Sequence, residues 1–173
     1  PTQCMLDLYS IRKTQGSLEN LEITLVGDLK YGRTVHSLVE AMSNFHAKFN
    51  LVSPVELKLP RAVKQHIKDA HLEYEQFTEL EDVIPHSDII YMTRVQRERF
   101  PDPLEYEKVK NSYVLRNSML ANAKPNCRVL HPLPRVTEIH VDVDANPAAY
   151  YFQQAQNGVY ARQAIISAIL GLK

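Results

Sequence analysis

The chain alternates between short apolar runs, typical of buried strands, and longer stretches in which apolar residues recur every three or four positions, typical of helices. The run "LEITLVG" at 21–27 ends in glycine, as expected of a parallel strand buried on both faces. The predicted strands are 21–27, 48–54, 71–77, 87–93 and 127–134. The predicted helices are 2–12, 33–45, 60–71, 79–85, 102–114, 117–123 and 146–170, the last with a break near Asn157 and Gly158.

This alternation predicts an α/β fold with a three-layer, doubly wound parallel sheet that has helices on both faces. Crossovers between parallel strands are right-handed, and ligands of such sheets bind beyond the carboxyl ends of the strands. Polar and charged residues follow the predicted strands at 27–34, 93–100 and 131–135. We therefore expect these three loops to form the functional site.

The first loop, "GDLKYGRT" at 27–34, nearly matches the phosphate-binding loop Gly-x-x-x-x-Gly-Lys-Thr. Arg33 stands where that motif has lysine. Lysine is a compact charge, whereas arginine is a planar fork that grips a carboxylate or phosphate through two N–H groups. Asp28 also places a negative charge where a phosphate would lie. Nucleotide binding is therefore disfavoured, and two interpretations stay open: a site for another small anion, or a purely structural turn.

The second loop, "TRVQRERF" at 93–100, combines charge with an amide. If the preceding strand continues to Gln96, the side chains of Arg94 and Gln96 point to the same side because they are two residues apart. The alternative is a charged surface loop whose Arg97, Glu98 and Arg99 pair locally, with little effect on stability.

The third loop, "HPLPR" at 131–135, has a backbone fixed by two prolines. Such a turn can hold carbonyl oxygens in set directions, where they accept hydrogen bonds from a ligand amine; the alternative is a rigid loop without function. His131 is either a catalytic base or a packed structural residue, which is the more usual role of one histidine after an apolar strand.

Composition adds few constraints. A chain of 173 residues that is 45% hydrophobic suits one domain or two small ones. The 20 basic and 20 acidic residues balance, which gives no electrostatic basis for binding nucleic acid or an anionic membrane. No His or Cys spacing fits a zinc site, and "DVDAN" lacks the glycine and glutamate of a calcium loop, so we expect no metal and no other cofactor. Two cysteines without a Cys-x-x-Cys pair are typical of a reduced, cytoplasmic protein.

Five stretches together resemble the catalytic chains of the aspartate transcarbamoylase family. In the order and at the spacing of that family they are "PTQCMLDLYSI", "VGDLKYGRTVHSL", "YMTRVQRERF", "VLHPLPRVTEI" and "YFQQAQNGVYARQAI". The related ornithine transcarbamoylases are expected to have a Ser-Met-Gly loop and His-Cys-Leu-Pro, whereas "RVQ" and "HPLP" stand here. The resemblance covers nearly the whole chain. It implies the second, aspartate-binding domain of the aspartate/ornithine carbamoyltransferase fold.

The resemblance also implies a reaction. In that family the amino group of L-aspartate attacks the carbonyl carbon of carbamoyl phosphate, giving N-carbamoyl-L-aspartate and phosphate for pyrimidine synthesis. By position, Arg33 would hold one aspartate carboxylate, and Arg94 with Gln96 would hold the other. The backbone carbonyls of Pro132 and Leu133 would face the substrate amine and the carbamoyl amide. Catalysis of this kind rests on positioning and charge stabilisation, without a protein nucleophile.

Further roles come from the same resemblance. Gln3 would help to bind the carbamoyl group, and Arg99 and Glu105 would lie in a mobile loop that helps the domains to close. The family's first domain carries a Ser-Thr-Arg-Thr phosphate loop, a further arginine and a histidine, and the adjacent subunit lends a lysine. None of these motifs occurs in this sequence. The resemblance therefore implies a carbamoyl-phosphate domain as partner, a homotrimer for the full-length enzyme, and in some assemblies regulatory chains.

The expected organisation is a connecting helix at 1–15, an aspartate-binding domain at 16–146, and a helix at 147–173 that packs on the carbamoyl-phosphate domain. Because a predicted helix already begins at residue 2 and the motifs of the first domain are absent, we expect a fragment that is inactive alone. We also expect partly uncovered apolar residues that promote association: Met5, Leu6, Ile165, Ile166, Ile169 and Leu170.

Two alternative functions belong to other classes. A dinucleotide-binding oxidoreductase is disfavoured because no Gly-x-Gly-x-x-Gly follows a strand. A non-catalytic domain of the same fold, serving only in assembly, is the other alternative. The intact Arg33, Arg94, Gln96 and "HPLP" argue against loss of the aspartate site.

Overall fold

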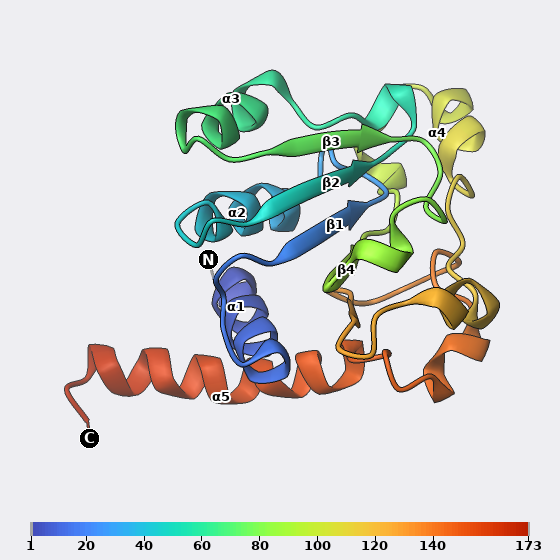
Figure 1. Ribbon diagram of the computed structural model, residues 1–173. Helices are drawn as coiled ribbons and strands as arrows, with labels where there is room; N and C mark the ends of the chain where they lie inside the picture. Colours follow the sequence, from blue (N-terminus) through green and yellow to red (C-terminus); the bar gives the residue numbers. More distant parts are fainter. Residues whose placement is uncertain (1, 173) are drawn as a thin grey trace.

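The computed structural model describes residues 2–172, and Figure 1 traces its helices and strands along the chain. Within this range one sheet contains β1 (Glu22–Val26), β2 (Lys48–Val52), β3 (Tyr74–Phe77), β4 (Ile89–Met92) and β5 (Arg128–Leu130). The α-helices are α1 (Thr2–Gln15), α2 (Arg33–Met42), α3 (Arg61–Asp69), α4 (Pro103–Val109) and α5 (Tyr151–Ile169). The short 3-10 helices are η1 (Val55–Leu57), η2 (Ile84–His86), η3 (Arg97–Arg99), η4 (Asn117–Asn122) and η5 (Val141–Ala145).

The sheet has the strand order β3-β2-β1-β4-β5, and all neighbouring strands are parallel, which confirms the predicted doubly wound fold. The central strand β1 pairs with β2 on one side and β4 on the other, so that Ile23 lies opposite both Phe49 and Ile89. From β1 the chain adds β2 and β3 on one side, and it then crosses back to add β4 and β5 on the other side. The switch point therefore lies between the neighbouring strands β1 and β4. This switch point is where a doubly wound sheet opens a crevice at the carboxyl ends of its strands.

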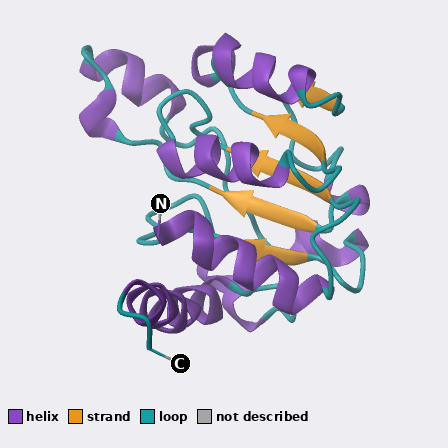
Figure 2. Cartoon of the chain, turned by 90° about the vertical axis from the view of Figure 1, so that its left-hand side faces the viewer, coloured by secondary structure: helices purple, strands orange, loops and turns teal. Residues whose placement is uncertain are grey.

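Alternate side chains of each strand point to opposite faces, so the sheet separates two apolar clusters. On one face, Ile23 and Leu25 pack beneath the layer formed by α1, α2 and α3, which Figure 2 shows side by side. On the other face, Val26 and Ile90 pack against the short helices η2, η4 and η5 and the beginning of α5. The two faces of the three-layer fold therefore differ in kind, with α-helices on one and mainly short 3-10 helices on the other.

The C-terminal helix differs from its prediction in two ways. It begins at Tyr151, and the residues before it return to the sheet: Ala149 forms a parallel bridge with Val129 of β5. The predicted break at Asn157 and Gly158 is wrong, because α5 is continuous there. Both residues are buried against α1, where a Cβ on Gly158 would lie 3.1 Å from Leu6 Cδ2. The Asn-Gly pair therefore marks a close helix crossing.

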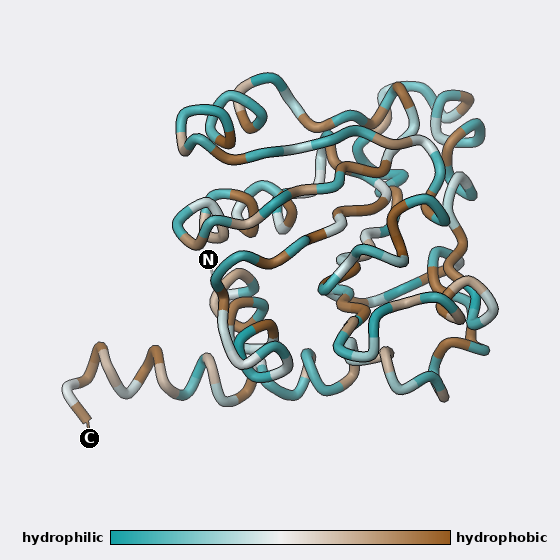
Figure 3. Tube along the Cα trace, in the orientation of Figure 1, coloured by the Kyte–Doolittle hydropathy of each residue, from teal (hydrophilic) through white to brown (hydrophobic). Residues whose placement is uncertain are grey.

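Helix α1 lies across α5 and packs closely on it, and the far half of α5 extends beyond this contact, away from the sheet (Figure 1). The expectation that Leu6 is uncovered is wrong, because it is buried beneath α5. Met5, Ile166, Ile169 and Leu170 are exposed, as expected. Figure 3 shows brown, hydrophobic stretches along the far half of α5 as well as along the sheet. No helix in the described range is long and apolar enough to cross a membrane.

Most other predicted elements occur with shifted ends. The predicted helix 102–114 ends already at Val109, the short helix expected at 79–85 is the 3-10 helix Ile84–His86, and the helix expected at 117–123 is a 3-10 helix. The predicted strand 127–134 is only Arg128–Leu130. It ends before "HPLP", where proline cannot donate to a ladder of hydrogen bonds.

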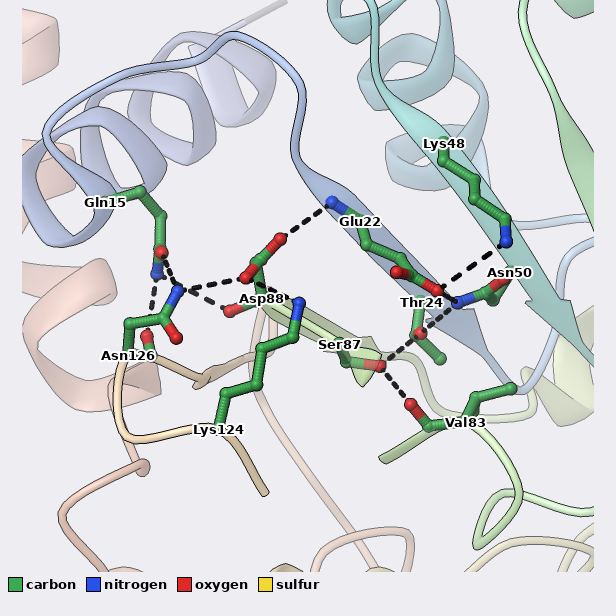
Figure 4. Close-up of polar contacts among 10 residues, drawn as sticks. All are labelled: Gln15, Glu22, Thr24, Lys48, Asn50, Val83, Ser87, Asp88, Lys124 and Asn126. Carbon is green, nitrogen blue, oxygen red and sulfur yellow. Dashed lines mark hydrogen bonds and ion pairs between the residues drawn. The ribbon is translucent and has the colours of Figure 1, made fainter. Parts of the chain in front are cut away.

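A cluster of polar side chains lies at the amino-terminal ends of the central strands, opposite the crevice (Figure 4). The Asp88 carboxylate accepts hydrogen bonds from the backbone N–H of Glu22 (2.9 Å), from Lys124 Nζ (3.0 Å) and from Asn126 Nδ2 (3.0 Å). Gln15, the last residue of α1, donates to the carbonyl oxygen of Asn126. Burial alone would raise the pKa of Asp88, but these hydrogen bonds outweigh it, so the pKa is lowered. The cluster thus joins α1, β1, β4 and the segment before β5.

Candidate active site

The loops after β1 and β4 are locked together at the switch point. Gly27 has φ 108, and a Cβ there would lie 2.5 Å from the carbonyl oxygen of Thr93, so only glycine fits without a shift of the backbone. The backbone N–H of Asp28 donates to Thr93 Oγ1 (3.0 Å), and Thr93 Oγ1 donates to the carbonyl oxygen of Val26 (2.8 Å). The predicted loops 27–34 and 93–100 are therefore neighbours.

A pocket of about 180 Å³ opens where these loops meet the turn after β5; we call it the strand-end pocket. Four of the predicted site residues line it: Arg94, Gln96, Pro132 and Leu133. The other lining residues are Gly32, Thr34, Thr93, His131 and Pro134. The structure thus gathers a guanidinium, an amide and a proline-rich turn around one small space, with residues from three separate loops.

Arg33 and Gln3 lie in a second, wider hollow of about 850 Å³ between α1 and α2, which we call the α1–α2 hollow. Thr34 lines both spaces, so the hollow and the strand-end pocket are adjacent. Arg33 is the first residue of α2 and is exposed. The two arginines predicted to grip one dicarboxylate therefore come from neighbouring strand ends, and they face two spaces that meet at Thr34.

The turn 131–134 is held from within. The ring of His131 is buried; its Nδ1 accepts a hydrogen bond from the backbone N–H of Leu133 (2.8 Å), so Nε2 is the nitrogen that donates to Glu138 Oε1 (2.7 Å). Both ring nitrogens are thus engaged, which supports the structural interpretation of His131 over the catalytic base. Burial alone would raise the pKa of Glu138, but the hydrogen bonds from His131 and from backbone N–H groups lower it overall.

The backbone of the turn 131–134 is unusual at Leu133. Leu133 has φ 52, in the left-handed region that a non-glycine residue enters only at a cost, and the Leu133–Pro134 peptide is cis. No backbone N–H in residues 2–172 donates to the carbonyl oxygens of Pro132 or Leu133. Both residues line the strand-end pocket, so their carbonyl oxygens are candidate acceptors for a ligand there.

The charged loop after β4 is partly paired within itself. Arg94 Nη2 lies 2.6 Å from Glu98 Oε1, with both side chains partly exposed, and Arg99 Nε donates to Gln96 Oε1 (3.2 Å). Exposed pairs of this kind contribute little to stability, so a ligand carboxylate can displace Glu98 from Arg94. Arg99 and Glu105 are exposed and lie outside both spaces.

Aromatic contacts seat this loop on the first one. Phe100 makes an edge contact with Tyr31, with ring centroids 5.9 Å apart, and another with Tyr106 at 5.7 Å. The segment that carries Arg99 and Glu105 thus rests against the loop that carries Arg33. Such edge-to-face pairs contribute roughly 0.5–1.5 kcal/mol each beyond the area they bury.

The position of Asp28 disfavours a nucleotide phosphate in the loop 27–34. Its carboxylate is buried beneath the loop, where Oδ1 accepts from the backbone N–H of Tyr31 (2.8 Å) and Oδ2 has no hydrogen-bond partner within residues 2–172. Burial raises its pKa, against the backbone hydrogen bonds that lower it. A phosphate enclosed by this loop would lie against the Asp28 carboxylate and be repelled, whereas Arg33 stands exposed at the start of α2, away from it.

Sequence reasoning missed a buried polar centre behind the site. Asp7 of α1 is fully buried and accepts hydrogen bonds from Gln3, Tyr91 and Gln154. A signal was present: Asp7 and Ser10 stand on the buried face of α1, between Leu6 and Ile11. A charged residue on a buried helix face needs partners, but the partner Gln154 is 147 residues away. No spacing rule connects them.

No group of three or more His, Cys, Asp or Glu side chains that could hold a metal ion occurs in the described part of the chain. What the fold and these contacts define is a doubly wound α/β domain with a cationic pocket at the carboxyl ends of neighbouring strands.

Comparison with known proteins identifies the family to which this domain belongs. Residues 19–169 match the model of the aspartate/ornithine carbamoyltransferase Asp/Orn-binding domain. The aspartate carbamoyltransferase catalytic subunit of Phocaeicola vulgatus is 62% identical over 173 residues, which cover 99% of this chain and 55% of that protein. The chain therefore belongs to the aspartate carbamoyltransferase catalytic chains and contains their Asp/Orn-binding domain, and it spans about half the length of the curated relatives it matches.

Solved structures agree in fold. The catalytic subunit of M. jannaschii aspartate transcarbamoylase is 44% identical, with a TM-score of 0.92 over 99% of this chain and 57% of that one. The enzyme from Trypanosoma cruzi in complex with N-(phosphonacetyl)-L-aspartic acid is 37% identical, with a TM-score of 0.87 over 96% of this chain and 54% of that one. The T. cruzi enzyme was also solved with carbamoyl phosphate, and with aspartate and phosphate.

Proposed function

We propose that this chain is the aspartate-binding half of an aspartate carbamoyltransferase, which transfers the carbamoyl group of carbamoyl phosphate to the amine of L-aspartate in pyrimidine synthesis. The observation that carries the proposal is the strand-end pocket, which Arg94 and Gln96 line together with Pro132 and Leu133, whose carbonyl oxygens accept no backbone hydrogen bond within residues 2–172. The T. cruzi enzyme, solved with aspartate, with carbamoyl phosphate and with N-(phosphonacetyl)-L-aspartic acid, supports this choice of ligands.

The roles follow from the chemistry of each group. Arg94, with Gln96 beside it, takes one aspartate carboxylate in the strand-end pocket through paired, charge-assisted hydrogen bonds. Arg33 takes the other carboxylate from the adjacent α1–α2 hollow, across Thr34. The carbonyl oxygens of Pro132 and Leu133 accept hydrogen bonds from the attacking amine and from the carbamoyl amide. The amine is thereby oriented toward the carbonyl carbon before it loses its proton.

Gln3 completes the proposed site from α1, where it contacts the carbamoyl group. The groups that bind the phosphate come from the carbamoyl-phosphate domain, and the full-length enzyme is proposed to be a cytoplasmic homotrimer that needs no cofactor. Arg99 and Glu105 belong to the loop that closes over the bound substrates. The exposed apolar groove between α1 and α5, lined among others by Met5, Tyr160 and Ile165, is where the carbamoyl-phosphate domain is proposed to pack.

A chimeric enzyme tests the proposal. In the P. vulgatus catalytic subunit, the segment that aligns with this chain is replaced by the whole chain, and the formation of carbamoyl-aspartate is measured. We expect turnover from the chimera and none from the 173-residue chain alone. Within the chimera, Arg94→Ala removes a bidentate contact and should lower kcat/KM for aspartate by about 100-fold or more.

The control is Arg97→Ala, which removes the same charge from an exposed position three residues along the same loop. We expect kcat/KM within about threefold of the parent, because an exposed arginine outside the pocket contributes little. A chimera that folds, forms its oligomer and produces no carbamoyl-aspartate would refute the proposed function. Equal effects of the two substitutions would refute the role of Arg94.

A further inference from the structure

Asp7 is a buried carboxylate at the centre of three elements. Its Oδ1 accepts hydrogen bonds from Gln3 Nε2 (2.8 Å) and Gln154 Nε2 (2.7 Å), and its Oδ2 accepts one from the hydroxyl of Tyr91 (2.8 Å). Gln3 belongs to α1, Gln154 to α5 and Tyr91 to β4. A carboxylate enclosed by donors in this way fixes the direction in which each donor points.

One of these donors leads to the strand-end pocket. Gln154 Oε1 accepts a hydrogen bond from the backbone N–H of His131 (2.8 Å), the residue that begins the turn 131–134. Both ends of the Gln154 amide are therefore used, its nitrogen on Asp7 and its oxygen on His131. Gln154 is buried, so neither contact is exchanged for water. The single side chain of Gln154 thus links Asp7 to the turn that carries the proposed carbonyl acceptors.

A second donor, Gln3, leads to the α1–α2 hollow. An ionised carboxylate can only accept, so the Gln3 amide must direct its NH2 group inward to Asp7. Its Oε1 is consequently the polar atom left to face the hollow, which Gln3 lines together with Arg33. An amide turned this way presents an acceptor to a ligand, and it suits an N–H group. It does not suit a phosphate or carboxylate oxygen.

We propose that Asp7 is a positioning residue: it turns the amide oxygen of Gln3 toward the ligand and, through Gln154, holds the turn 131–134 in register with it. The ligand group recognised at Gln3 is therefore an N–H donor such as the NH2 of a carbamoyl group. This identification of the ligand rests on the proposed function, whereas the orientation of the amide does not.

The alternative is that Asp7 serves only to hold α1 against α5. A second polar contact between these helices provides the matched control, because it lacks any link to Gln3. Ser10, one turn further along α1, is buried, donates to the carbonyl oxygen of Leu6 and accepts from Asn157 Nδ2 of α5 (3.0 Å). Ser10→Ala removes an interhelical hydrogen bond and leaves the amide of Gln3 untouched.

The kinetic test uses the chimeric enzyme with Asp7→Leu, Gln3→Ala and the double variant. Leucine has nearly the shape of aspartate and cannot accept a hydrogen bond. We expect Asp7→Leu to lower kcat/KM for carbamoyl phosphate by about tenfold or more, and the double variant to lose at least about fivefold less than the product of the two single losses. Asp7→Asn, whose one oxygen can still accept from both glutamines, should restore most of the activity.

Ser10→Ala should leave kcat/KM within about twofold of the parent while lowering the stability. Losses of Asp7→Leu and Gln3→Ala that simply multiply would overturn the proposal, because a carboxylate that only holds the helices has no coupling to Gln3. The same conclusion would follow if Ser10→Ala impaired turnover as much as Asp7→Leu.

A second measurement is independent of the reaction. In the 15N-labelled 173-residue chain, the side-chain NH2 signals of Gln3 are assigned by their loss in Gln3→Ala. We expect these signals to move toward the positions of a solvated glutamine in Asp7→Leu and to stay in place in Ser10→Ala. Unchanged Gln3 signals in a folded Asp7→Leu variant would overturn the proposed orientation. If the signals move but the chimera is inactive, the proposed function fails and the orientation stands.

Discussion

Because the carboxylate of Asp7 is buried, we expect the stability of the chain to depend measurably on pH. Burial raises the pKa of Asp7 from the ordinary 3.8 to about 6, against the hydrogen bonds from Gln154, Tyr91 and Gln3 that lower it. The folded state therefore binds the proton more tightly than the unfolded state does. The contribution of Asp7 to stability is fully present below pH 3.8, and it is lost as the pH rises through about 6.

The size of the effect follows from the shift. A difference of about two pKa units corresponds to about 3 kcal/mol of unfolding free energy, because each unit is worth about 1.4 kcal/mol. Since Asp7 is fully buried, solvent screening reduces this value little. Other carboxylates also make the stability depend on pH, and those of Asp88 and Glu138 do so with the opposite sign because their pKa values are lowered. The effect of Asp7 must therefore be isolated by a difference between variants.

The assay compares the parent chain with Asp7→Asn by urea unfolding at several pH values. Asparagine does not ionise, and it keeps one oxygen for the two glutamine amides. We expect the unfolding free energy of Asp7→Asn, relative to the parent, to increase by about 3 kcal/mol between about pH 4 and pH 7. Asp82→Asn, at an exposed position, controls for the loss of a surface charge. A difference that stays within about 0.5 kcal/mol across this range would refute the reasoning.

Three further substitutions test the fold. Gly27→Ala places a Cβ 2.5 Å from the carbonyl oxygen of Thr93, at φ 108. It should lower the unfolding free energy more than Gly16→Ala does, because a Cβ at Gly16, with φ 77, meets nothing within 4 Å. Equal losses in urea unfolding would contradict the steric argument. Asp88→Asn should destabilise the chain by about 1–3 kcal/mol at neutral pH. Because the pKa of Asp88 is lowered, that loss should shrink as the pH falls below the unfolded pKa, and a loss that grows in acid would contradict the assignment. Phe49→Ala empties a fully buried position in the central strands and should lower the unfolding free energy by about 3–5 kcal/mol, whereas a loss below about 1 kcal/mol would show that the core collapses around it.

The central strands β1 and β4 could be predicted from the sequence because they are buried on both faces. Segments 21–27 and 87–93 are mostly apolar runs with sharp ends, and the structure places β1 and β4 within them. The order of the strands has no local signal, since it depends on which crossovers pack best. General rules for parallel sheets nevertheless predicted that the loops after them would meet, and those after β1 and β4 do.

The Asn157–Gly158 pair shows where local propensity is overruled. Both residues favour turns in isolation, and glycine inside a helix costs roughly 1 kcal/mol relative to alanine. Here glycine lets α5 approach Leu6 closely, and Asn157 Nδ2 donates to Ser10 Oγ of α1. The burial and the hydrogen bond gained at the crossing offset the propensity. Only a contact between residues 147 positions apart accounts for this, so a local pattern could not predict it.

The site, too, has one part that topology predicts and another part that contacts between distant residues decide. Arg94, Gln96 and the turn 131–134 follow strand ends, so topology alone brings them to one pocket. Which group of each side chain faces a ligand is decided by contacts of another kind. The Gln3 amide takes its direction from Asp7, and Asp7 requires Gln154 from the far end of the chain to stay buried. If this is correct, restoring an acceptor at position 7 should matter more for turnover than restoring the packing of α1 on α5. The contrast between Asp7→Asn and Asp7→Leu measures that difference, because both fill the space and only asparagine can accept from the two amides.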